Sequence, residues 1–200
     1  MAERSYRKLF WGLAVVGLVL DQVSKYGVFR WLYNGGQGDQ REVVPSAFEL
    51  LARFTRESGS GPLRTWGGDL MPEVNHGALF GFLGQHVALA NALFAVISLA
   101  AAGAIAWWSS RPSARHERGL SAALGLILAG TLGNLFDRLV FGGVRDFMHL
   151  HYQSFDWPVF NLADCCLVCG AFLLLAQAFF GKSAAESPAT PTRKEMAEVR

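Results

Sequence analysis

Four long apolar runs constrain this chain more than any other feature of its sequence. They cover residues 9–33, 86–108, 119–141 and 158–181. A helix needs about 20 apolar residues to cross the hydrocarbon core of a bilayer, and each run reaches that length. Lipid offers no hydrogen-bond partner to open backbone groups, so each run is expected to be helical. The predicted fold class is an all-α polytopic membrane protein with four transmembrane helices.

The composition agrees with a membrane protein. Charged residues make up 17% of the chain and hydrophobic residues 52%, whereas about a quarter of a soluble domain is charged. The net charge is only +2, and the basic residues are spread out instead of forming a stripe. We therefore expect the lipid bilayer, and no nucleic acid, among the partners of this chain.

The basic residues that flank the apolar runs predict how the chain is oriented. Three flanks that fall on one side of the membrane are basic: residues 4–8, 111–118 and 182–194. Basic flanks mark the cytoplasmic side, so both termini are predicted to be cytoplasmic. No small-x-small cleavage site follows the first run, which is expected to be an uncleaved anchor. Residues 1–181 would form the membrane domain, 34–85 a small extracytoplasmic β-containing subdomain with a flexible turn at 57–62, and 182–200 a disordered tail.

Ionisable residues inside or against the apolar runs are the main indication of function. A charge at mid-membrane costs roughly 2.5–3.5 kcal/mol, so a chain that repeats this cost in one place uses the charges for chemistry or transport. A helix rises about 1.5 Å per residue, which puts all of these residues toward the outer side. They are Asp21, Asp137, Arg138, Asp146 and Asp164.

Two of these carboxylates have a cation close in sequence. Asp137 is adjacent to Arg138, and Asp21 lies one helical turn from Lys25. A cation nearby keeps a carboxylate ionised, which makes it a poor proton shuttle. We therefore interpret Asp137–Arg138 and Asp21–Lys25 as structural ion pairs or helix–helix clamps.

Asp146 and Asp164 are the better candidates for catalysis. The one cation adjacent to them is Arg145, which would point to the opposite face of an extended segment. Two carboxylates brought together in a medium of low dielectric cannot both ionise easily, so the pKa of one rises. One can then activate water while the other, protonated, polarises a carbonyl group. Such a pair requires neither a metal ion nor a covalent intermediate.

Other motifs are weaker. His149 and His151 would share one face of a strand and could bind a metal, although exposed interfacial histidines are the commoner outcome. The three cysteines, Cys165, Cys166 and Cys169, all lie in one apolar run. They are interpreted as small apolar helix residues and not as a disulfide framework or metal site. No metal and no cofactor are expected.

Five short segments carry a resemblance to a known family. In order they are Asp21-Gln22-Val23-Ser24-Lys25, Asn75-His76-Gly77-Ala78-Leu79-Phe80-Gly81, Gly133-Asn134-Leu135-Phe136-Asp137-Arg138, Val144-Arg145-Asp146-Phe147 and Phe160-Asn161-Leu162-Ala163-Asp164. They resemble the motifs of the bacterial lipoprotein signal peptidases (signal peptidase II). Five such motifs in the expected order on four spans are a far more specific signal than any one of them.

The resemblance implies an aspartyl endopeptidase of the bacterial cytoplasmic (inner) membrane, with its site on the extracytoplasmic side. It would remove the signal peptide from prolipoproteins by cleaving before a diacylglyceryl-modified Cys, and we expect it to be a monomer. It also implies a small β-cradle and a mobile helix over the site, both placed in 34–85. The catalytic dyad carries over to Asp146 and Asp164. The residues expected to order the site or bind substrate are Asp21, Lys25, Asn75, Gly77, Asn134, Asp137, Arg138 and Asn161.

Two functions of other classes remain open from the residues alone. A small transporter or proton channel would use the same carboxylates, but it requires polar residues along a path to both faces, and the inner halves of the runs lack them. A non-catalytic assembly protein would use the polar residues only to hold its helices together.

Overall fold

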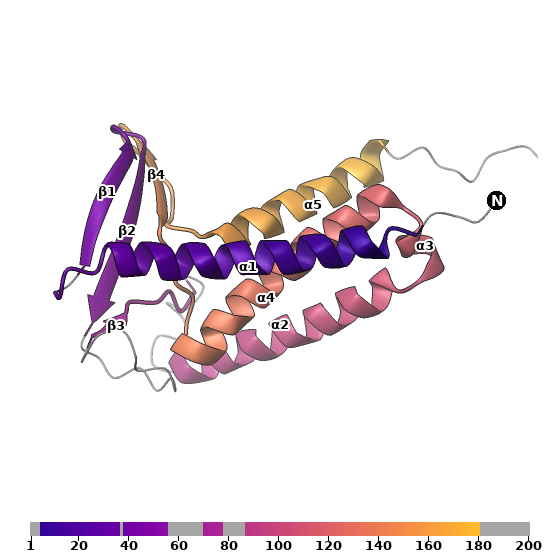
Figure 1. The fold of residues 1–200 in the computed structure, drawn as a ribbon, viewed down its shortest axis with the longest axis horizontal. Coiled ribbons are helices and arrows are strands. Elements are labelled where there is room, and N and C mark those ends of the chain that lie inside the picture. The colour runs from indigo at the N-terminus through magenta and orange to yellow at the C-terminus, as the bar shows by residue number, and fades with distance from the viewer. Residues whose placement is uncertain (1–4, 37, 56–69, 78–86, 181–200) are drawn as a thin grey trace, which may run out of the picture.

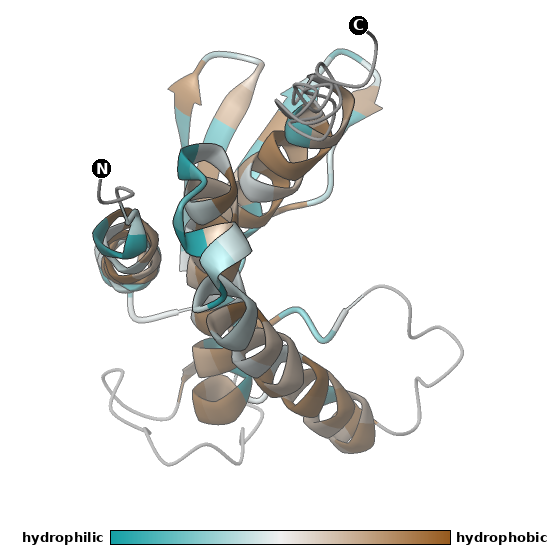
Figure 2. Ribbon diagram, turned by 90° about the vertical axis from the view of Figure 1, so that its right-hand side faces the viewer, coloured by the Kyte–Doolittle hydropathy of each residue, from teal (hydrophilic) through white to brown (hydrophobic). Residues whose placement is uncertain are grey.

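The computed structural model describes residues 5–36, 38–55, 70–77 and 87–180 of the chain. Its long helices are α1 (Arg7–Trp31), α2 (Val87–Ser109), α4 (Arg118–Phe141) and α5 (Leu162–Phe180). Four helices in the described part are long and apolar enough to cross a membrane, as predicted from the apolar runs. Figure 2, which looks along the bundle, shows that hydrophobic residues cover most of these helices. The predicted turn at 57–62 and tail at 182–200 lie outside the described residues.

Helix α4 is the central helix of the bundle, in contact with α1, α2 and α5. Glycines on α4 let its neighbours approach closely, as is common in membrane helices. A Cβ atom on Gly133 would lie 2.6 Å from Oδ2 of Asp21 on α1, and a Cβ atom on Gly130 would overlap the carbonyl oxygen of Ala163 on α5. Close packing at this point brings the polar residues of three helices together.

A small antiparallel sheet lies at one end of the bundle, which we call the sheet end (Figure 1). The other end carries the short helix α3 (Pro112–Arg115), which the sequence did not predict, and is called the α3 end. The strand order is β1-β2-β4-β5, with β3 paired to β2. The strands are β1 (Gly38–Val44), β2 (Phe48–Thr55), β3 (Met71–Pro72), β4 (Met148–Tyr152) and β5 (Phe155–Asp156).

The sheet requires two corrections to the predicted fold. The chain is not all-α, and the β-subdomain is not confined to 34–85, because β4 and β5 come from the connection between α4 and α5. The pairing of β2 with β4 joins residues about a hundred positions apart in the chain. The residue pattern of a short segment does not show which distant strand it will pair with. The described residues of 34–85 form strands and no helix; 56–69 and 78–86, where the predicted mobile helix would have to lie, are outside the description.

Apolar packing fixes the sheet to the end of α1. Phe29 and Leu32, at the last turn of α1, form a buried cluster with Ala52 and Phe54 of β2 and with Phe147. Phe147 directly precedes β4, so the cluster also holds the segment between α4 and β4 in place. This segment carries Asp146.

Candidate active site

The polar residues predicted from the sequence meet at the sheet end of the bundle, and they form two connected groups. The first is a fully buried ion network. Asp21 accepts from Nζ of Lys25 at 2.9 Å, and the same nitrogen lies 3.3 Å from Oδ2 of Asp137. Arg145 contacts Asp137 at 2.8 Å through Nη2. Two carboxylates and two cations thus balance in a site that excludes water.

The predicted pair of Asp21 with Lys25 is confirmed, and the predicted pair of Asp137 with Arg138 is wrong. Consecutive helix residues point about 100° apart, so Asp137 and Arg138 face different neighbours. Asp137 faces Lys25 and Arg145. Arg138 faces α2, where its carbonyl oxygen accepts from Nδ2 of Asn91 at 3.0 Å and its guanidinium lies 4.5 Å from the ring centre of Phe94.

Sequence reasoning missed the roles of Gln22 and Arg145. The backbone N–H of Arg145 donates to Asp137 at 2.9 Å, and Nη2 donates to Oε1 of Gln22 at 2.9 Å. Its guanidinium carbon lies 4.3 and 4.0 Å from the ring centres of Tyr26 and Phe141, where cation–π attraction stabilises the charge. Arg145 shares none of these partners with Asp146, which accepts from Asn75 and Asn161. Both residues belong to the motifs quoted above. A glutamine or an arginine is usually exposed, however, so the residue type gave no indication that these side chains bind inside the bundle.

The second group contains the predicted acid pair, and neutral amides surround it. Asp146 accepts from Nδ2 of Asn75 at 2.9 Å and from Nδ2 of Asn161 at 2.6 Å. Asp164 accepts from Nδ2 of Asn134 at 2.9 Å and from the backbone N–H of Asn161 at 3.1 Å. One residue, Asn161, therefore donates to both carboxylates and links them.

The start of α5 explains why Asn161 and Asp164 lie together. Asn161 is the N-cap of α5: its Oδ1 accepts from the N–H of Asp164, while Asp164 accepts from the N–H of Asn161, both at 3.1 Å. This reciprocal arrangement is a capping box, here with Asp in the position that Glu or Gln often fills. Asp21 of α1 accepts from the next free N–H, that of Ala163, at 2.8 Å. The helix therefore begins at Leu162, four residues later than predicted.

Backbone hydrogen bonds of Asn75 and a bond from Gly77 position the Asn75 side chain against Asp146. The backbone groups of Asn75 and Val144 bond each other at 2.7 and 2.9 Å. Oδ1 of Asn75 accepts from the N–H of Gly77 at 2.7 Å, which leaves Nδ2 to donate to Asp146. Gly77 has a φ of +97°, a left-handed conformation that favours glycine. The predicted site residues Asn75 and Gly77 thus act as a unit.

The surroundings of Asp146 raise its pKa to about 6. Burial is the largest cause, because it penalises the charged form, and the charge of Asp164 adds to it. Hydrogen bonds from Asn75 and Asn161 and the charge of Lys25 act in the opposite direction. Asp146 is therefore poised to hold or release a proton near neutral pH.

The described residues contain no group of three His, Cys, Asp or Glu side chains arranged to hold a metal ion. His149 lies between two carboxylates, with Nδ1 2.8 Å from Glu49 and Nε2 2.5 Å from Asp156. The ring of His151 lies 5.3 Å from that of His149. All three cysteines of α5 are free thiols.

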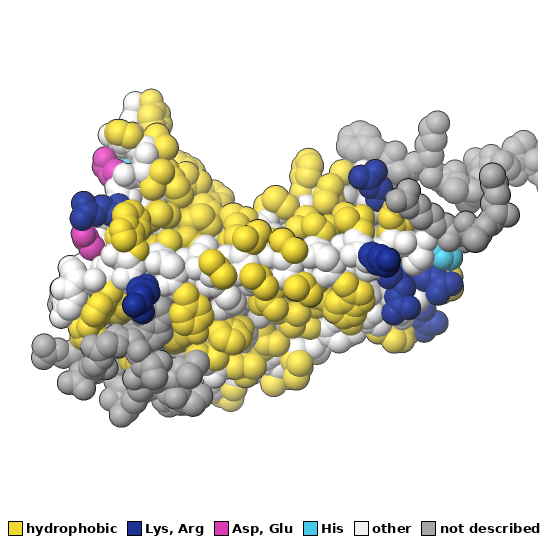
Figure 3. Space-filling view, viewed as in Figure 1, with side chains coloured by type: hydrophobic (Ala, Val, Ile, Leu, Met, Phe, Trp, Pro, Cys, Tyr) yellow, Lys and Arg dark blue, Asp and Glu magenta, His cyan; other side chains and the backbone are white. Residues whose placement is uncertain are grey.

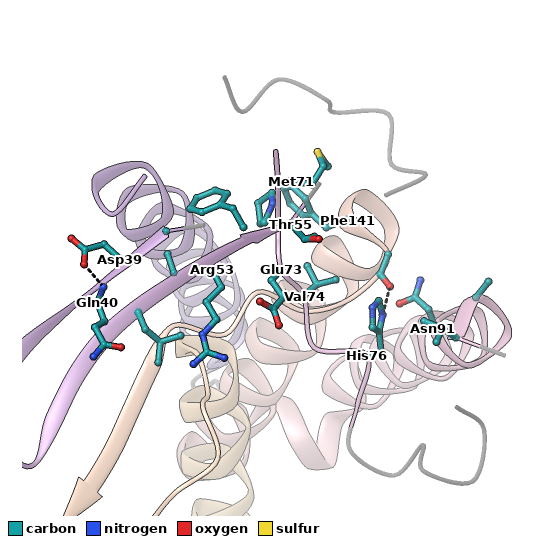
Figure 4. Close-up of a pocket in the computed structure, with 18 residues that line it drawn as sticks. Asp39, Gln40, Arg53, Thr55, Met71, Glu73, Val74, His76, Asn91 and Phe141 are labelled. Carbon is teal, nitrogen blue, oxygen red and sulfur yellow. Dashed lines mark hydrogen bonds between the residues drawn. The ribbon is translucent and has the colours of Figure 1, made fainter. Parts of the chain in front are cut away.

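A cavity of about 1220 Å³ lies between β1, β2, β3 and the start of α2 (Figure 4). Asp146 and Asp164 are not among the residues that line it, whereas Asn91 and His76 are. Asn91 binds Arg138, and His76 follows Asn75, so the cavity extends along the α2 side of the site. Its volume exceeds the range of about 300–1000 Å³ that is common for small-ligand pockets.

Comparisons with known proteins agree with this architecture. A family model described as signal peptidase (SPase) II matches residues 13–180. The lipoprotein signal peptidase of Pseudoalteromonas atlantica is 35% identical over 180 residues, which cover 90% of this chain and 94% of that protein. That of Cellvibrio japonicus is 32% identical over 192 residues, covering 94% and 98%. A bacterial membrane enzyme solved by the in meso method at 2.3 Å resolution has a TM-score of 0.67 at 22% identity and covers 96% of this chain and 99% of its own, a likeness that shows a shared fold. This chain therefore belongs to the signal peptidase II family.

Proposed function

We propose that this chain is a membrane aspartyl endopeptidase that removes the signal peptide from prolipoproteins, by cleaving before a diacylglyceryl-modified Cys. Membership of the signal peptidase II family implies a protease, and the family together with four apolar helices fits a multi-pass protein of the bacterial inner membrane. The relatives named above are lipoprotein signal peptidases, which supports prolipoproteins as the substrate class.

The link through Asn161 is the observation that carries this proposal. Asp146 and Asp164 are each one hydrogen bond from the same residue, and neither forms an ion pair with a described residue. Two such carboxylates share one proton more easily than they both ionise. The pKa of Asp146, raised to about 6, supports a proton that the pair holds more readily than an isolated carboxylate would.

In the proposed reaction the ionised carboxylate takes a proton from a water molecule, which attacks the scissile carbonyl carbon. The protonated carboxyl donates to the carbonyl oxygen, so that negative charge does not build up there. The tetrahedral intermediate then collapses with proton transfer to the leaving amine. All bond changes are accounted for by water and the two aspartates.

The neighbouring residues would hold this pair in position. Asn75, Asn134 and Asn161 orient the four carboxylate oxygens by donating hydrogen bonds. Arg138 is close enough to Asp146 and Asp164 to interact with both electrostatically, and no described residue forms an ion pair with it. We propose that it contacts the substrate.

The depth of the acid pair suits a lipidated substrate. Asp164 is in the first turn of α5, and Asp146 lies between the end of α4 and β4. We propose that this level is the extracytoplasmic membrane interface. The scissile amide would then lie at the headgroups while the diacylglyceryl chains lie along the helices, in the leaflet from which the substrate enters.

A substrate pair tests the proposal. Purified protein in proteoliposomes, with a chelator present, is given a signal-peptide segment whose Cys carries diacylglyceryl, and separately the same segment without lipid. We expect cleavage directly before the lipidated Cys and little or none of the unlipidated segment. Failure to cleave the lipidated peptide, or loss of cleavage on chelation, would contradict the proposal. Ion flux without cleavage would support a transporter instead.

A further inference from the structure

We propose that the outer half of the sheet is a second membrane-contact surface, an apolar face that lies on the lipid headgroup region at the sheet end of the bundle. We call it the overhanging face, and its residues are Phe48, Leu150, Tyr152, Phe155 and Trp157. The inference depends on the four helices spanning a membrane and not on the catalytic proposal, so the two can fail separately.

Strand register shows that the apolar side chains share one face. Residues paired across antiparallel strands point to the same side, as do residues two apart along one strand. Phe48 pairs with Leu150, and Leu50 with Met148. On the next strand pair, Tyr152 pairs with Phe155. The ring of Trp157, just beyond β5, stacks on that of Phe155 with centroids 6.0 Å apart.

The opposite face of the same strands is polar. Glu49 pairs with His149, and His151 with Asp156. The two bonds of His149 to Glu49 and Asp156 tie β2, β4 and β5 together on that side. The sheet is thus amphipathic, with a charged side and an apolar side, as expected of an element that lies flat on a membrane surface.

Helix α1 covers only the inner half of the apolar side. Leu50 and Met148 pack against the cluster that contains Phe29 and Leu32. Farther out, the exposed fractions are 41% for Leu150, 62% for Tyr152, 55% for Phe155 and 52% for Trp157. The sheet extends sideways past the helices in Figure 1. In Figure 3 hydrophobic side chains continue from this part of the sheet onto the helices, while charged ones lie along its far edge.

Continuity with the membrane-spanning surface points to lipid as the occupant. Trp157 precedes the first residue of α5, Leu162, by only five residues, which keeps the overhanging face close to the end of a helix that is long and apolar enough to cross a membrane. Tyr, Trp and Phe are favoured at that level because their rings suit the boundary between headgroups and acyl chains. Arg41, paired with Leu50 on the same face, lies 3.5 Å from Asp39 through Nη2, and both side chains are exposed. From there its guanidinium can exchange Asp39 for a lipid phosphate while its stem rests on apolar surface.

Spin labels on the two faces test the proposal. In a full-length chain with Cys165, Cys166 and Cys169 replaced by Ala, a single nitroxide is placed at Phe155→Cys or Tyr152→Cys. The matched control is Glu42→Cys, which lies on the polar face opposite Glu49. Each protein is reconstituted in phosphatidylglycerol–phosphatidylethanolamine vesicles. The relaxation of the label by oxygen, which enters lipid, is compared with relaxation by a water-soluble nickel chelate.

We expect the ratio of oxygen to nickel relaxation to be severalfold higher at 155 and 152 than at 42. Equal ratios at the three positions would overturn the proposal. Protection of 155 from both reagents, lost on dilution with lipid, would show that a second copy of the chain covers the face, and would also overturn it. Thermal unfolding that matches the unlabelled chain controls for folding at each position.

Discussion

At the scale of single residues, the carboxylates of the site differ in their partners. Asp21 pairs with Lys25, and Asp137 pairs with Lys25 and Arg145. Asp146 and Asp164 face the amides of Asn75, Asn134 and Asn161. A neutral donor orients a carboxylate without neutralising it, so the pair can still exchange protons. This difference in partners distinguishes the proposed catalytic pair from the buried ion network.

The activity is expected to depend on pH in the direction set by Asp146. The proposed reaction requires the pair to keep one proton, and the pKa of Asp146 is raised to about 6 in the folded protein. As the pH rises through this value the shared proton is lost, so kcat/KM should fall about tenfold per pH unit well above it. Initial rates with the lipidated peptide between about pH 5 and 9 measure this dependence. A flat profile would contradict the shared proton.

Stability should follow the same titration. The folded pKa of Asp146 lies above its ordinary value of 3.8, so folding binds a proton. The resulting stabilisation is fully present below the ordinary pKa and is lost as the pH rises through about 6. Asp146→Asn should therefore make thermal unfolding less dependent on pH over this window.

At the scale of elements, the cap of α5 and the acid pair use the same residue. Asn161 caps the helix through Oδ1 and donates to Asp146 through Nδ2. Asp164 is at the same time the last residue of the capping box, at position N3 of the helix, and one of the proposed catalytic groups. The residues that fix the start of α5 are therefore the same residues that join Asp146 to Asp164.

Two substitutions at Asn161 separate these roles. Asn161→Ala loses the cap and the bond to Asp146, and should lower the free energy of unfolding by about 1 kcal/mol as well as the activity. Asn161→Ser keeps a capping oxygen but has no amide to donate to Asp146. It should unfold close to the original chain yet lose activity, mainly in kcat. Full activity in the Ser variant would show that the link through Asn161 is structural only.

Local patterns in the sequence were enough to predict several of these elements. The apolar runs predicted the four spans, and the one-turn spacing of Asp21 and Lys25 predicted their ion pair on α1. Contacts that depend on how the chain turns back were not predictable. Arg145 reaches Asp137 because the chain reverses after Gly142, whose φ is +77°. Asn91 reaches Arg138 only because α2 packs on α4.

At the scale of the whole molecule, the buried ion network joins segments far apart in sequence. It connects α1 and α4 with the segment that leads to β4, and Asp21 extends it to the start of α5. Both carboxylates and both cations have fully buried side chains. A balanced set of this kind specifies one arrangement of the helices, because any other arrangement would leave a charge unpaired.

Removing one cation should therefore destabilise the whole bundle. Lys25→Met leaves Asp21 without its cation and should lower the free energy of unfolding by about 3–5 kcal/mol. The double variant Asp21→Asn with Lys25→Met removes both charges and should recover part of that loss. Unfolding in mixed micelles measures both. Asp21→Asn is also measured alone. If the double variant loses as much stability as the two single variants added together, the charges are not paired as described.

The most direct test of the central claim is cleavage by Asp146→Asn and Asp164→Asn, each made alone. The substrate is the diacylglyceryl-modified peptide, and each protein is first shown to be folded and inserted in liposomes. Each variant loses a group that exchanges a proton in the proposed reaction, so kcat/KM should fall by roughly 10²–10⁴-fold while thermal unfolding remains close to that of the original chain. Cleavage at the original rate by either folded variant would contradict the assignment of the pair.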